Sequence, residues 1–180
     1  MITIVSGLPR SGTSLLMQIL LAGGYPVYWD KLPNADACNP KGYYEWAGAK
    51  ELHVERDAKM RAVDGKCVKI FPYTWFALTP AFDYQHIYID RSVDDVYASH
   101  QRFFRIKGRG FTTKDGLEEI RWHALIYLRS FRALILRHQE IQDEKPIEAI
   151  DWFLEPTYGK RTCKQLEQMK TCVDHSLIHF

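Results

Sequence analysis

The stretch that decides the fold is Ile2-Thr3-Ile4-Val5-Ser6-Gly7-Leu8-Pro9-Arg10-Ser11-Gly12-Thr13-Ser14. It begins with an apolar run that is typical of a buried strand, and the apolar residues that follow it keep the spacing of a helix face: Leu15, Leu16, Ile19 and Leu20. A strand that turns through glycines into the start of a helix makes an anion-binding site, because unpaired N–H groups and the positive end of the helix dipole point at the ligand. The stretch therefore predicts a phosphate-binding loop.

This loop departs from the usual nucleotide-binding pattern at one position. Gly7 and Gly12 have the spacing of a P-loop, in which the second glycine is normally followed by lysine and then by serine or threonine. Here Thr13 stands in the place of that lysine, and the nearest cation is Arg10, inside the loop. We therefore expect a loop that binds phosphate but does not serve ATP in the usual way.

The composition is that of a single globular domain. The 180 residues are 46% hydrophobic and 13% aromatic, which suffices for one core, so we expect one domain over residues 1–180. A net charge of +2 gives no indication of nucleic-acid binding. The four cysteines form no Cys-x-x-Cys pair, which indicates reduced thiols. No secretory leader opens the sequence and no apolar run approaches the roughly 18 residues of a membrane span, so we expect a cytoplasmic protein without membrane binding.

The pattern along the chain is that of strands alternating with helices. We expect strands at 2–6, 26–29, 67–71, 86–90 and 147–152, and helices at 13–23, 45–61, 93–105, 115–138 and 160–172. Such alternation predicts an α/β, three-layer P-loop fold with a central, mostly parallel sheet flanked by helices. Ligands of such sheets bind at the carboxyl ends of the strands, where Arg10, Lys69 and Arg91 are expected.

Three segments, in the same order, resemble those of sulfotransferases that use 3′-phosphoadenosine-5′-phosphosulfate (PAPS). Pro9-Arg10-Ser11-Gly12-Thr13-Ser14-Leu15-Leu16 resembles their 5′-phosphosulfate loop. Arg91, Asp95, Val96 and Ser99 match an Arg-x-x-x-Asp-Val-x-x-Ser pattern that follows a strand. Asn39-Pro40-Lys41-Gly42-Tyr43-Tyr44-Glu45 is similar to a segment of compact bacterial-type members. The resemblance covers residues 1 to about 105 and implies the fold predicted above.

The resemblance also implies a reaction and its residues. A sulfuryl group would pass from PAPS to a hydroxyl or amine of a small-molecule or glycan acceptor, releasing adenosine 3′,5′-bisphosphate. Sulfuryl transfer resembles phosphoryl transfer, so the protein must position the reactants and neutralise charge on the leaving phosphate without strictly requiring a metal. Arg10 is the expected cation for that charge, and Lys69 is expected to touch the sulfonate. The expected phosphate ligands are Ser11, Gly12, Thr13 and Ser14 for the 5′-phosphate, and Arg91 and Ser99 for the 3′-phosphate.

The general base is where the chain departs from the family pattern. Cytosolic members have Lys-Thr-His where this chain has Lys69-Ile70-Phe71, so Phe71 stands in the place of their catalytic histidine. Some relatives use a glutamate, and we expect Glu45 to take the acceptor proton. A glutamate in the first turn of a helix, favoured by the helix dipole, is the alternative interpretation of Glu45. The further candidates are Glu51, His53 and Asp36.

Each motif also has an ordinary structural interpretation. Arg10 and Arg91 can be surface residues at turns, and the loop serine and threonine can simply cap a helix. Lys69 can be an edge-strand lysine in water, and Ser99 can fill a helix interior. Loop 107–114 is either a basic lid or a solvated loop. Tyr158-Gly159-Lys160-Arg161 is a weak candidate for the basic segment that completes the 3′-phosphate site in cytosolic members.

Two other function classes remain open at this point. A P-loop small-molecule kinase using ATP and magnesium would need a carboxylate at the end of a strand, and Asp90 occupies such a position. The missing lysine counts against a kinase, which also has no role for Arg91 and Ser99. The second alternative is a nucleotide-binding module without turnover, which the missing histidine favours.

Overall fold

Five parallel strands form one sheet at the centre of the molecule. The computed structural model describes residues 1–30, 35–36, 39–107, 113–142 and 146–173. The strands are β1 (Ile2–Gly7), β2 (Val27–Tyr28), β3 (Cys67–Lys69), β4 (Tyr84–Asp90) and β5 (Arg132–Arg137), in the spatial order β2-β3-β1-β4-β5. The first strand is therefore central and its six residues are all buried, as an apolar strand covered on both faces requires.

The register places the carboxyl ends of three neighbouring strands at one edge of the sheet. Val5 of β1 lies opposite Lys69 of β3, and Gly7 lies opposite Ile89 of β4. The chain runs from β1 to β2 and β3 on one side and then crosses to β4 on the other. Such a change of direction is where open α/β sheets bind their ligands. The loop that follows β1 begins at this point.

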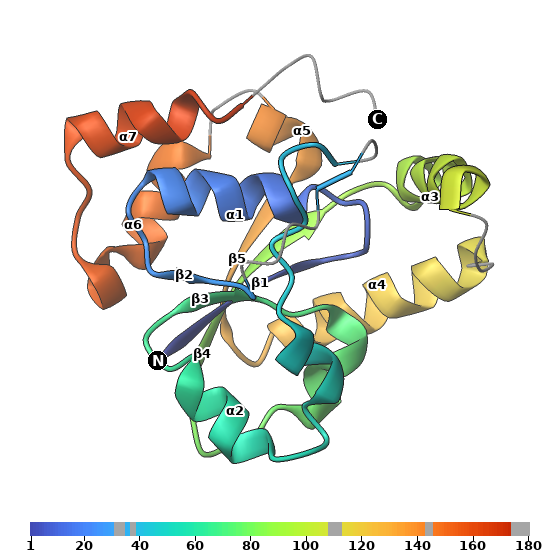
Figure 1. Ribbon diagram of the computed structural model, residues 1–180, viewed down its shortest axis with the longest axis horizontal. Coiled ribbons are helices and arrows are strands. Elements are labelled where there is room, and N and C mark those ends of the chain that lie inside the picture. The colour runs from blue at the N-terminus through green and yellow to red at the C-terminus, as the bar shows by residue number, and fades with distance from the viewer. Residues whose placement is uncertain (31–34, 37–38, 108–112, 143–145, 174–180) are drawn as a thin grey trace.

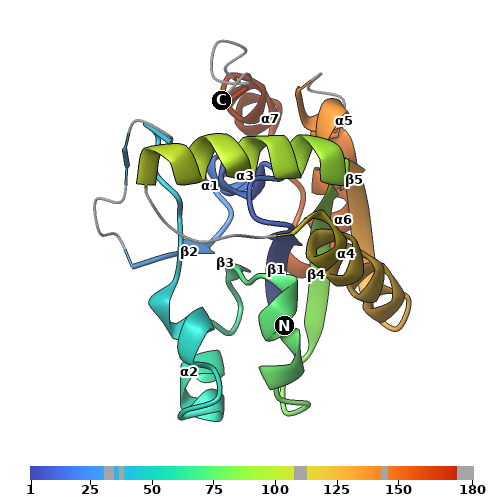
Figure 2. The same cartoon turned by 90° about the vertical axis from the view of Figure 1, so that its right-hand side faces the viewer.

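Helices cover both faces of the sheet (Figures 1 and 2). One face packs against α1 (Thr13–Ala22), α5 (His138–Gln142), α6 (Ile147–Tyr158) and α7 (Cys163–Lys170). The other packs against η1 (Ala47–Glu51), α2 (Arg56–Ala62), η2 (Pro72–Ala77) and α4 (Lys114–Leu128). In β4, Ile87 and Ile89 join the first core, whereas Tyr88 joins the second, which is the two-residue alternation of a strand. The predicted three-layer α/β architecture is confirmed.

A separate small core joins the phosphate-binding loop to α3 (Val93–Lys107). Leu8 of the loop packs with Val93 and Val96 of α3 and with Leu117 of α4. Figure 2 shows α3 lying across the end of the sheet at which the strands finish. The first turns of α1 and α3 are therefore held near the same sheet edge.

The predicted helix over 115–138 is wrong in its second half. Helix α4 ends at Leu128, and residues 132–137 form the edge strand β5, which pairs with β4 from Gln85 to Asp90. The helix ends without glycine or proline: the N–H groups of Arg129, Ser130 and Phe131 donate to carbonyls three residues back, which tightens the chain into a turn.

Two other expected elements also differ. The expected strand 147–152 is the helix α6, in which Ile147, Ile150 and Leu154 are buried at helical spacing and Trp152 is exposed. The expected helix 45–61 is two short elements, η1 and α2, separated at Glu55, whose φ of 51° interrupts a right-handed helix.

Two further expectations concern membrane spans and cysteines. No helix in the described part of the chain is both long enough and apolar enough to span a membrane. Cys67, Cys163 and Cys172 are free thiols, as expected, and Cys38 lies outside the described residues.

Candidate functional site

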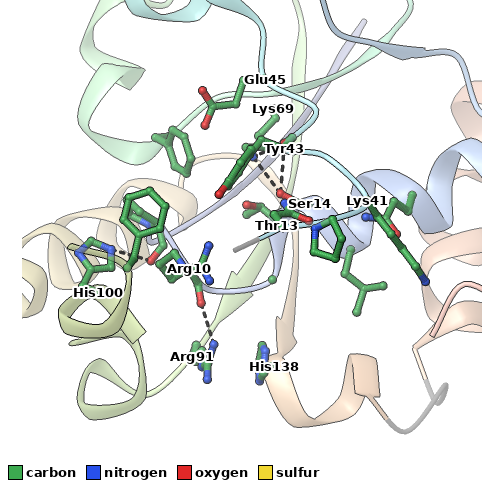
Figure 3. A pocket seen from close by; sticks show the side chains of 18 of the residues that line it. Arg10, Thr13, Ser14, Lys41, Tyr43, Glu45, Lys69, Arg91, His100 and His138 are labelled. Atoms are coloured by element: carbon green, nitrogen blue, oxygen red, sulfur yellow. Dashed lines mark hydrogen bonds between the residues drawn. The ribbon is translucent and has the colours of Figure 1, made fainter. Parts of the chain in front are cut away.

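A pocket of about 470 Å³ opens at the sheet edge where β1, β3 and β4 end. Its size is in the range of pockets that hold small molecules and cofactors, about 300–1,000 Å³. Figure 3 shows the labelled side chains that surround it, with Glu45 and Lys69 at one end and Arg91 and His138 at the other. Of the residues expected from the sequence, the lining includes Arg10, Gly12, Thr13, Ser14, Glu45, Lys69 and Arg91. Separate segments of the chain thus converge on one cavity.

Two glycines shape the phosphate-binding loop. A Cβ atom on Gly7 would lie 2.4 Å from Ser11 Oγ and 2.8 Å from the carbonyl oxygen of Ile89, so glycine lets the loop pass this close to β4. Gly12 has a φ of 101°, a conformation that residues with side chains rarely adopt. It precedes α1, whose first-turn N–H groups have no intrahelical partner and receive no side-chain cap. These N–H groups are donors at the wall of the pocket.

Ser11 supports the loop from inside. Its N–H donates to the carbonyl oxygen of Leu8 at 3.0 Å, and its side chain is fully buried beside Gly7. Ser11 is not among the residues that line the pocket, and its N–H is already bonded within the loop. The other predicted groups, the N–H groups of Gly12 and Thr13 and the hydroxyls of Thr13 and Ser14, belong to residues that line the pocket.

Arg10 is held at the pocket by three contacts. Its backbone has a φ of 71°, in the left-handed region that is uncommon for a residue with a side chain. Arg91 Nη1 donates to the Arg10 carbonyl oxygen at 2.8 Å and thereby supports this conformation. Arg10 Nε donates to Ser99 Oγ at 3.2 Å, and the guanidinium lies 5.3 Å from the ring centre of Phe103. Ser99 itself is buried and does not line the pocket, so it orients Arg10 from behind.

Arg91 is partly desolvated at the other end of the pocket. Burial is the main cause that lowers the pKa of its guanidinium, and the nearby charge of Arg10 lowers the pKa further. The group remains charged near neutral pH because an arginine pKa starts above 12. Arg91 Nε is buried and has no hydrogen-bond partner among the described residues. A partly buried cation in the wall of a pocket favours an anionic ligand beside it.

Lys69 connects three segments at the floor of the pocket. Its side chain is 3% exposed, and its ammonium donates to the Tyr43 carbonyl oxygen and, at 3.2 Å, to Ser14 Oγ. Ser14 Oγ in turn donates to the same carbonyl at 3.2 Å. Burial lowers the pKa of Lys69 to about 8, against the opposing effect of the Glu45 carboxylate. The alternative of an edge-strand lysine in water does not apply, because β3 lies inside the sheet.

The segment from Asn39 to Glu45 forms a wall of the pocket. Asn39 Nδ2 donates to the Gly42 carbonyl at 2.7 Å, and the Tyr43 hydroxyl donates to Asp36 Oδ1 at 2.9 Å, so the turn is held by its own polar groups. Glu45 lines the pocket and its carboxylate pairs with Lys50 at 3.1 Å. That pair is largely exposed and is expected to be weak.

The other candidate bases do not reach the pocket. Asp36 accepts hydrogen bonds from the Asn39 N–H and the Tyr43 hydroxyl, and therefore has a structural role in the turn. Glu51 pairs with Lys59 at 3.3 Å, and His53 is exposed to solvent. None of the three lines the pocket. Glu45 is therefore the one base candidate from the sequence that the fold brings to the site.

Two histidines of the pocket were not predicted from the sequence. His100 on α3 contacts the Pro9 carbonyl oxygen through Nε2 at 3.2 Å, and burial lowers its pKa. His138 follows β5 directly, and burial, followed by the charge of Arg91, lowers its pKa to about 4. Recognising 132–137 as a strand would have placed His138 at a strand's carboxyl end, where ligand-binding residues gather.

Asp90 is engaged away from the pocket. Its two carboxylate oxygens accept from Arg121 Nε and Nη2 at 2.6 and 2.7 Å, a two-pronged ion pair between the end of β4 and α4. Asp90 does not line the pocket. The group that a kinase would use for magnesium is thus occupied by an arginine.

The C-terminal basic candidate lies at the far end of α1. The Arg161 guanidinium stacks over Tyr25 at 4.5 Å and donates to the carbonyls of Gly23 and Gly24, beyond the last turn of α1. The pocket is at the first turn of that helix, so this segment does not reach it. The proposed basic lid falls mostly on residues 108–112, which lie outside the described residues.

The pocket is an anion-binding environment. Among the described residues, its lining carries five cations and one carboxylate, Glu45; the cations are Arg10, Lys41, Lys50, Lys69 and Arg91. Within the described ranges, no group of three or more His, Cys, Asp or Glu side chains is arranged to hold a metal ion. Cations combined with helix N–H groups suit a ligand with more than one negative group.

Comparison with known proteins assigns the chain to no family. A scan against protein-family models finds no match, and a search among curated proteins finds no similar sequence. The functional argument therefore depends on the residues of the pocket.

Proposed function

We propose that the protein is a PAPS-dependent sulfotransferase, which transfers a sulfuryl group to a hydroxyl or amine of a small-molecule or glycan acceptor and releases adenosine 3′,5′-bisphosphate. The observation that carries this proposal is the convergence of Arg10, Lys69 and Arg91 with the uncapped first turn of α1 in one cavity. A nucleotide with a single phosphate chain has its phosphates at the loop and leaves no second phosphate for Arg91 to bind. The desolvated cation Arg91, away from Lys69, gives a second phosphate a place to bind (Figure 3).

The donor set fits the two phosphate groups of such a nucleotide. The N–H groups at the start of α1 suit the 5′-phosphate, since a helix N-terminus binds phosphate through its dipole and free donors. Arg91, whose guanidinium carries a charge in the lining of the same cavity, suits the 3′-phosphate through charge-assisted hydrogen bonds. Bound PAPS would supply the sulfuryl group that is transferred.

Each of three residues around the reacting centre has a different role in the transfer. Arg10, fixed by Ser99 and Phe103, stabilises the negative charge that develops on the leaving 5′-phosphate oxygen as its bond to sulfur breaks. Lys69 holds the sulfonate oxygens from the floor of the pocket. Glu45 accepts the proton of the acceptor hydroxyl while the oxygen of that hydroxyl forms its bond to sulfur.

The acceptor would enter beside Glu45 and Lys69. Phe71 and Tyr73 stack there with ring centres 5.6 Å apart, and both line the pocket. Phe71, in the place of the histidine of cytosolic members, therefore contributes a flat apolar surface rather than a base. Such a surface suits the ring of a small aglycone or of a sugar, which agrees with a small-molecule or glycan acceptor.

A kinase is the less favoured alternative. Thr13 replaces the phosphate-binding lysine, and Asp90 is paired with Arg121 of α4 and does not line the cavity. Magnesium would have to displace that arginine to use the carboxylate. A kinase also has no second phosphate for the partly buried Arg91 guanidinium to bind.

The role of Glu45 separates an enzyme from a module that only binds nucleotide. Glu45→Gln should reduce the release of adenosine 3′,5′-bisphosphate from PAPS by about 100-fold or more, the usual loss with a general base, in the presence of a mixed panel of phenols, alcohols and sugars. Its calorimetric affinity for the bisphosphate should stay within about threefold of wild type. Glu51→Gln, outside the pocket, is the matched control. If wild-type protein binds the bisphosphate but sulfates no member of the panel, that result would contradict the proposal of an enzyme and favour a binding module.

A further inference from the structure

The Arg91 end of the pocket lacks the second ligand that the sequence predicts. Ser99 was expected to share the 3′-phosphate with Arg91, yet its side chain is 1% exposed and its hydroxyl accepts from Arg10 Nε. It is not part of the pocket lining. A phosphate that reaches Arg91 would therefore meet only one of its two expected partners.

His138 is the side chain that occupies this end of the pocket instead. It lines the cavity, and Figure 3 shows it beside Arg91. Its Cδ2 lies 3.1 Å from the position that a Cβ atom would take at Gly12, so the ring is packed directly against the phosphate-binding loop. Its position is set by β5, whose last pairs with β4 are Leu136 to Ile89 and Arg137 to Asp90. His138 and Arg91 therefore follow neighbouring strands by one residue each.

We propose that His138 is a ligand of the nucleotide's 3′-phosphate, paired with Arg91 in the place expected for Ser99. The inference rests on the proposed function, because it names a residue of that same nucleotide site. An imidazole can donate one hydrogen bond when neutral and two when protonated, so it serves a phosphate in either state. Gly12 is favoured for a second reason besides its positive φ, because a side chain at this position would press against the His138 ring.

The charges around His138 make the binding depend on pH in a defined direction. Burial is the main cause that lowers the pKa of His138; the charge of Arg91, from the end of β4, lowers the pKa further, and Asp95 on α3 raises it. On the segment of His138 itself, the Glu140 carboxylate accepts from the Arg137 N–H at 2.8 Å. Arg91 in turn donates to the Arg10 carbonyl oxygen at 2.8 Å. With a pKa near 4 the free imidazole is neutral at pH 7. A phosphate dianion beside it favours the imidazolium, so binding raises the pKa and takes up protons. Affinity should then rise as the pH falls toward the pKa of the bound state.

The test compares two nucleotides that differ in the 3′-phosphate alone. Adenosine 3′,5′-bisphosphate and adenosine 5′-monophosphate are titrated calorimetrically into wild type, His138→Ala and His138→Gln. His138→Ala should weaken the bisphosphate by about tenfold, the usual cost of one hydrogen bond to a charged group, and the monophosphate by less than about twofold. His138→Gln, which keeps a donor of similar length, should lose less affinity and confirm that the fold is intact. His123→Gln, an exposed histidine on α4, is the matched control and should change neither.

The number of protons taken up on binding separates a phosphate ligand from a residue that only packs, because a purely packing role for His138 would not change that number. Titrations of the bisphosphate near pH 6 in buffers of different ionisation enthalpy give the protons exchanged on binding. Wild type should take up more protons than His138→Gln, and the phosphate's own titration near pH 6 cancels in that difference. Two results would overturn the role of His138 but not the proposed function. One is an unchanged preference for the bisphosphate in His138→Ala, and the other is an equal loss of affinity for both nucleotides. Equal wild-type affinity for the two nucleotides would overturn the sulfotransferase proposal itself.

Discussion

At the scale of single residues, the site is built from cations that the fold holds in place. Arg10 adopts a positive φ that Arg91 supports through its carbonyl, and Ser99 and Phe103 fix its guanidinium. An uncommon backbone conformation that neighbouring groups maintain is a frequent property of functional sites. Lys69 is buried without a carboxylate in hydrogen-bond contact, which is costly unless a ligand shares its charge.

The lowered pKa of Lys69 predicts how donor binding responds to pH. The ammonium is present below a pKa of about 8 and is lost as the pH rises through that value, so wild-type affinity for PAPS should fall between about pH 7 and about pH 9. Lys69→Arg keeps its charge throughout this range and should show a flatter profile. Affinities measured by calorimetry at a series of pH values check this.

The control for that experiment is Lys66→Arg. Lys66 precedes β3 at the edge of the sheet opposite the pocket, where its ammonium lies over the Tyr28 ring at 4.6 Å. This variant should keep the wild-type profile. A Lys69→Arg protein whose affinity declines in parallel with wild type would show that another group is responsible for the pH dependence.

At the scale of elements, the loop between β1 and α1 determines whether anions can bind. Gly12→Ala forces a side chain into a φ of 101° and against His138, and we expect it to abolish measurable bisphosphate binding and to lower the free energy of unfolding by about 1–3 kcal/mol. Gly65→Ala is the matched control, because Gly65 also has a positive φ, 72°, but has no atom within 4 Å of the added Cβ. It should lose about 1–2 kcal/mol of stability through the backbone alone and keep full binding. Denaturant unfolding and calorimetry measure the two effects, and unchanged binding in Gly12→Ala would contradict the role given to the loop.

The elements that the sequence predicts correctly are those with strong local signals. The run Ile2–Val5, the glycines after it and the helical spacing of Leu16 and Leu20 define β1, the loop and α1. β5 was missed because no glycine or proline separates it from α4, and the apolar residues of 131–136 also fit a helical period. For α6 the signal was present: Ile147, Ile150 and Leu154 have helical spacing, whereas the strand interpretation places the exposed Trp152 on the same face as Ile150.

At the scale of the whole molecule, the parallel sheet brings together residues that the sequence separates by more than 100 positions. Because β3, β1, β4 and β5 are neighbours, Lys69, the loop, Arg91 and His138 lie in a row along one edge. Arg10, Lys69 and Arg91 could be predicted from their positions at or just after the carboxyl ends of strands. The burial of Ser99 and Ser11 and the pairing of Asp90 with Arg121 could not, since they depend on how α3 and α4 pack against the sheet.

The central claim is that this row of residues binds a nucleotide with phosphates on both its 3′ and 5′ positions, without a metal. The most direct test is a calorimetric titration with adenosine 3′,5′-bisphosphate in the presence of a chelator, compared with ATP and magnesium, on wild type and Arg91→Ala. Metal-independent binding of the bisphosphate, at least about tenfold tighter than ATP and lost or strongly weakened in Arg91→Ala, is the result we predict. Tight ATP binding that requires magnesium, with no preference for a 3′-phosphate, would contradict the account and favour a kinase.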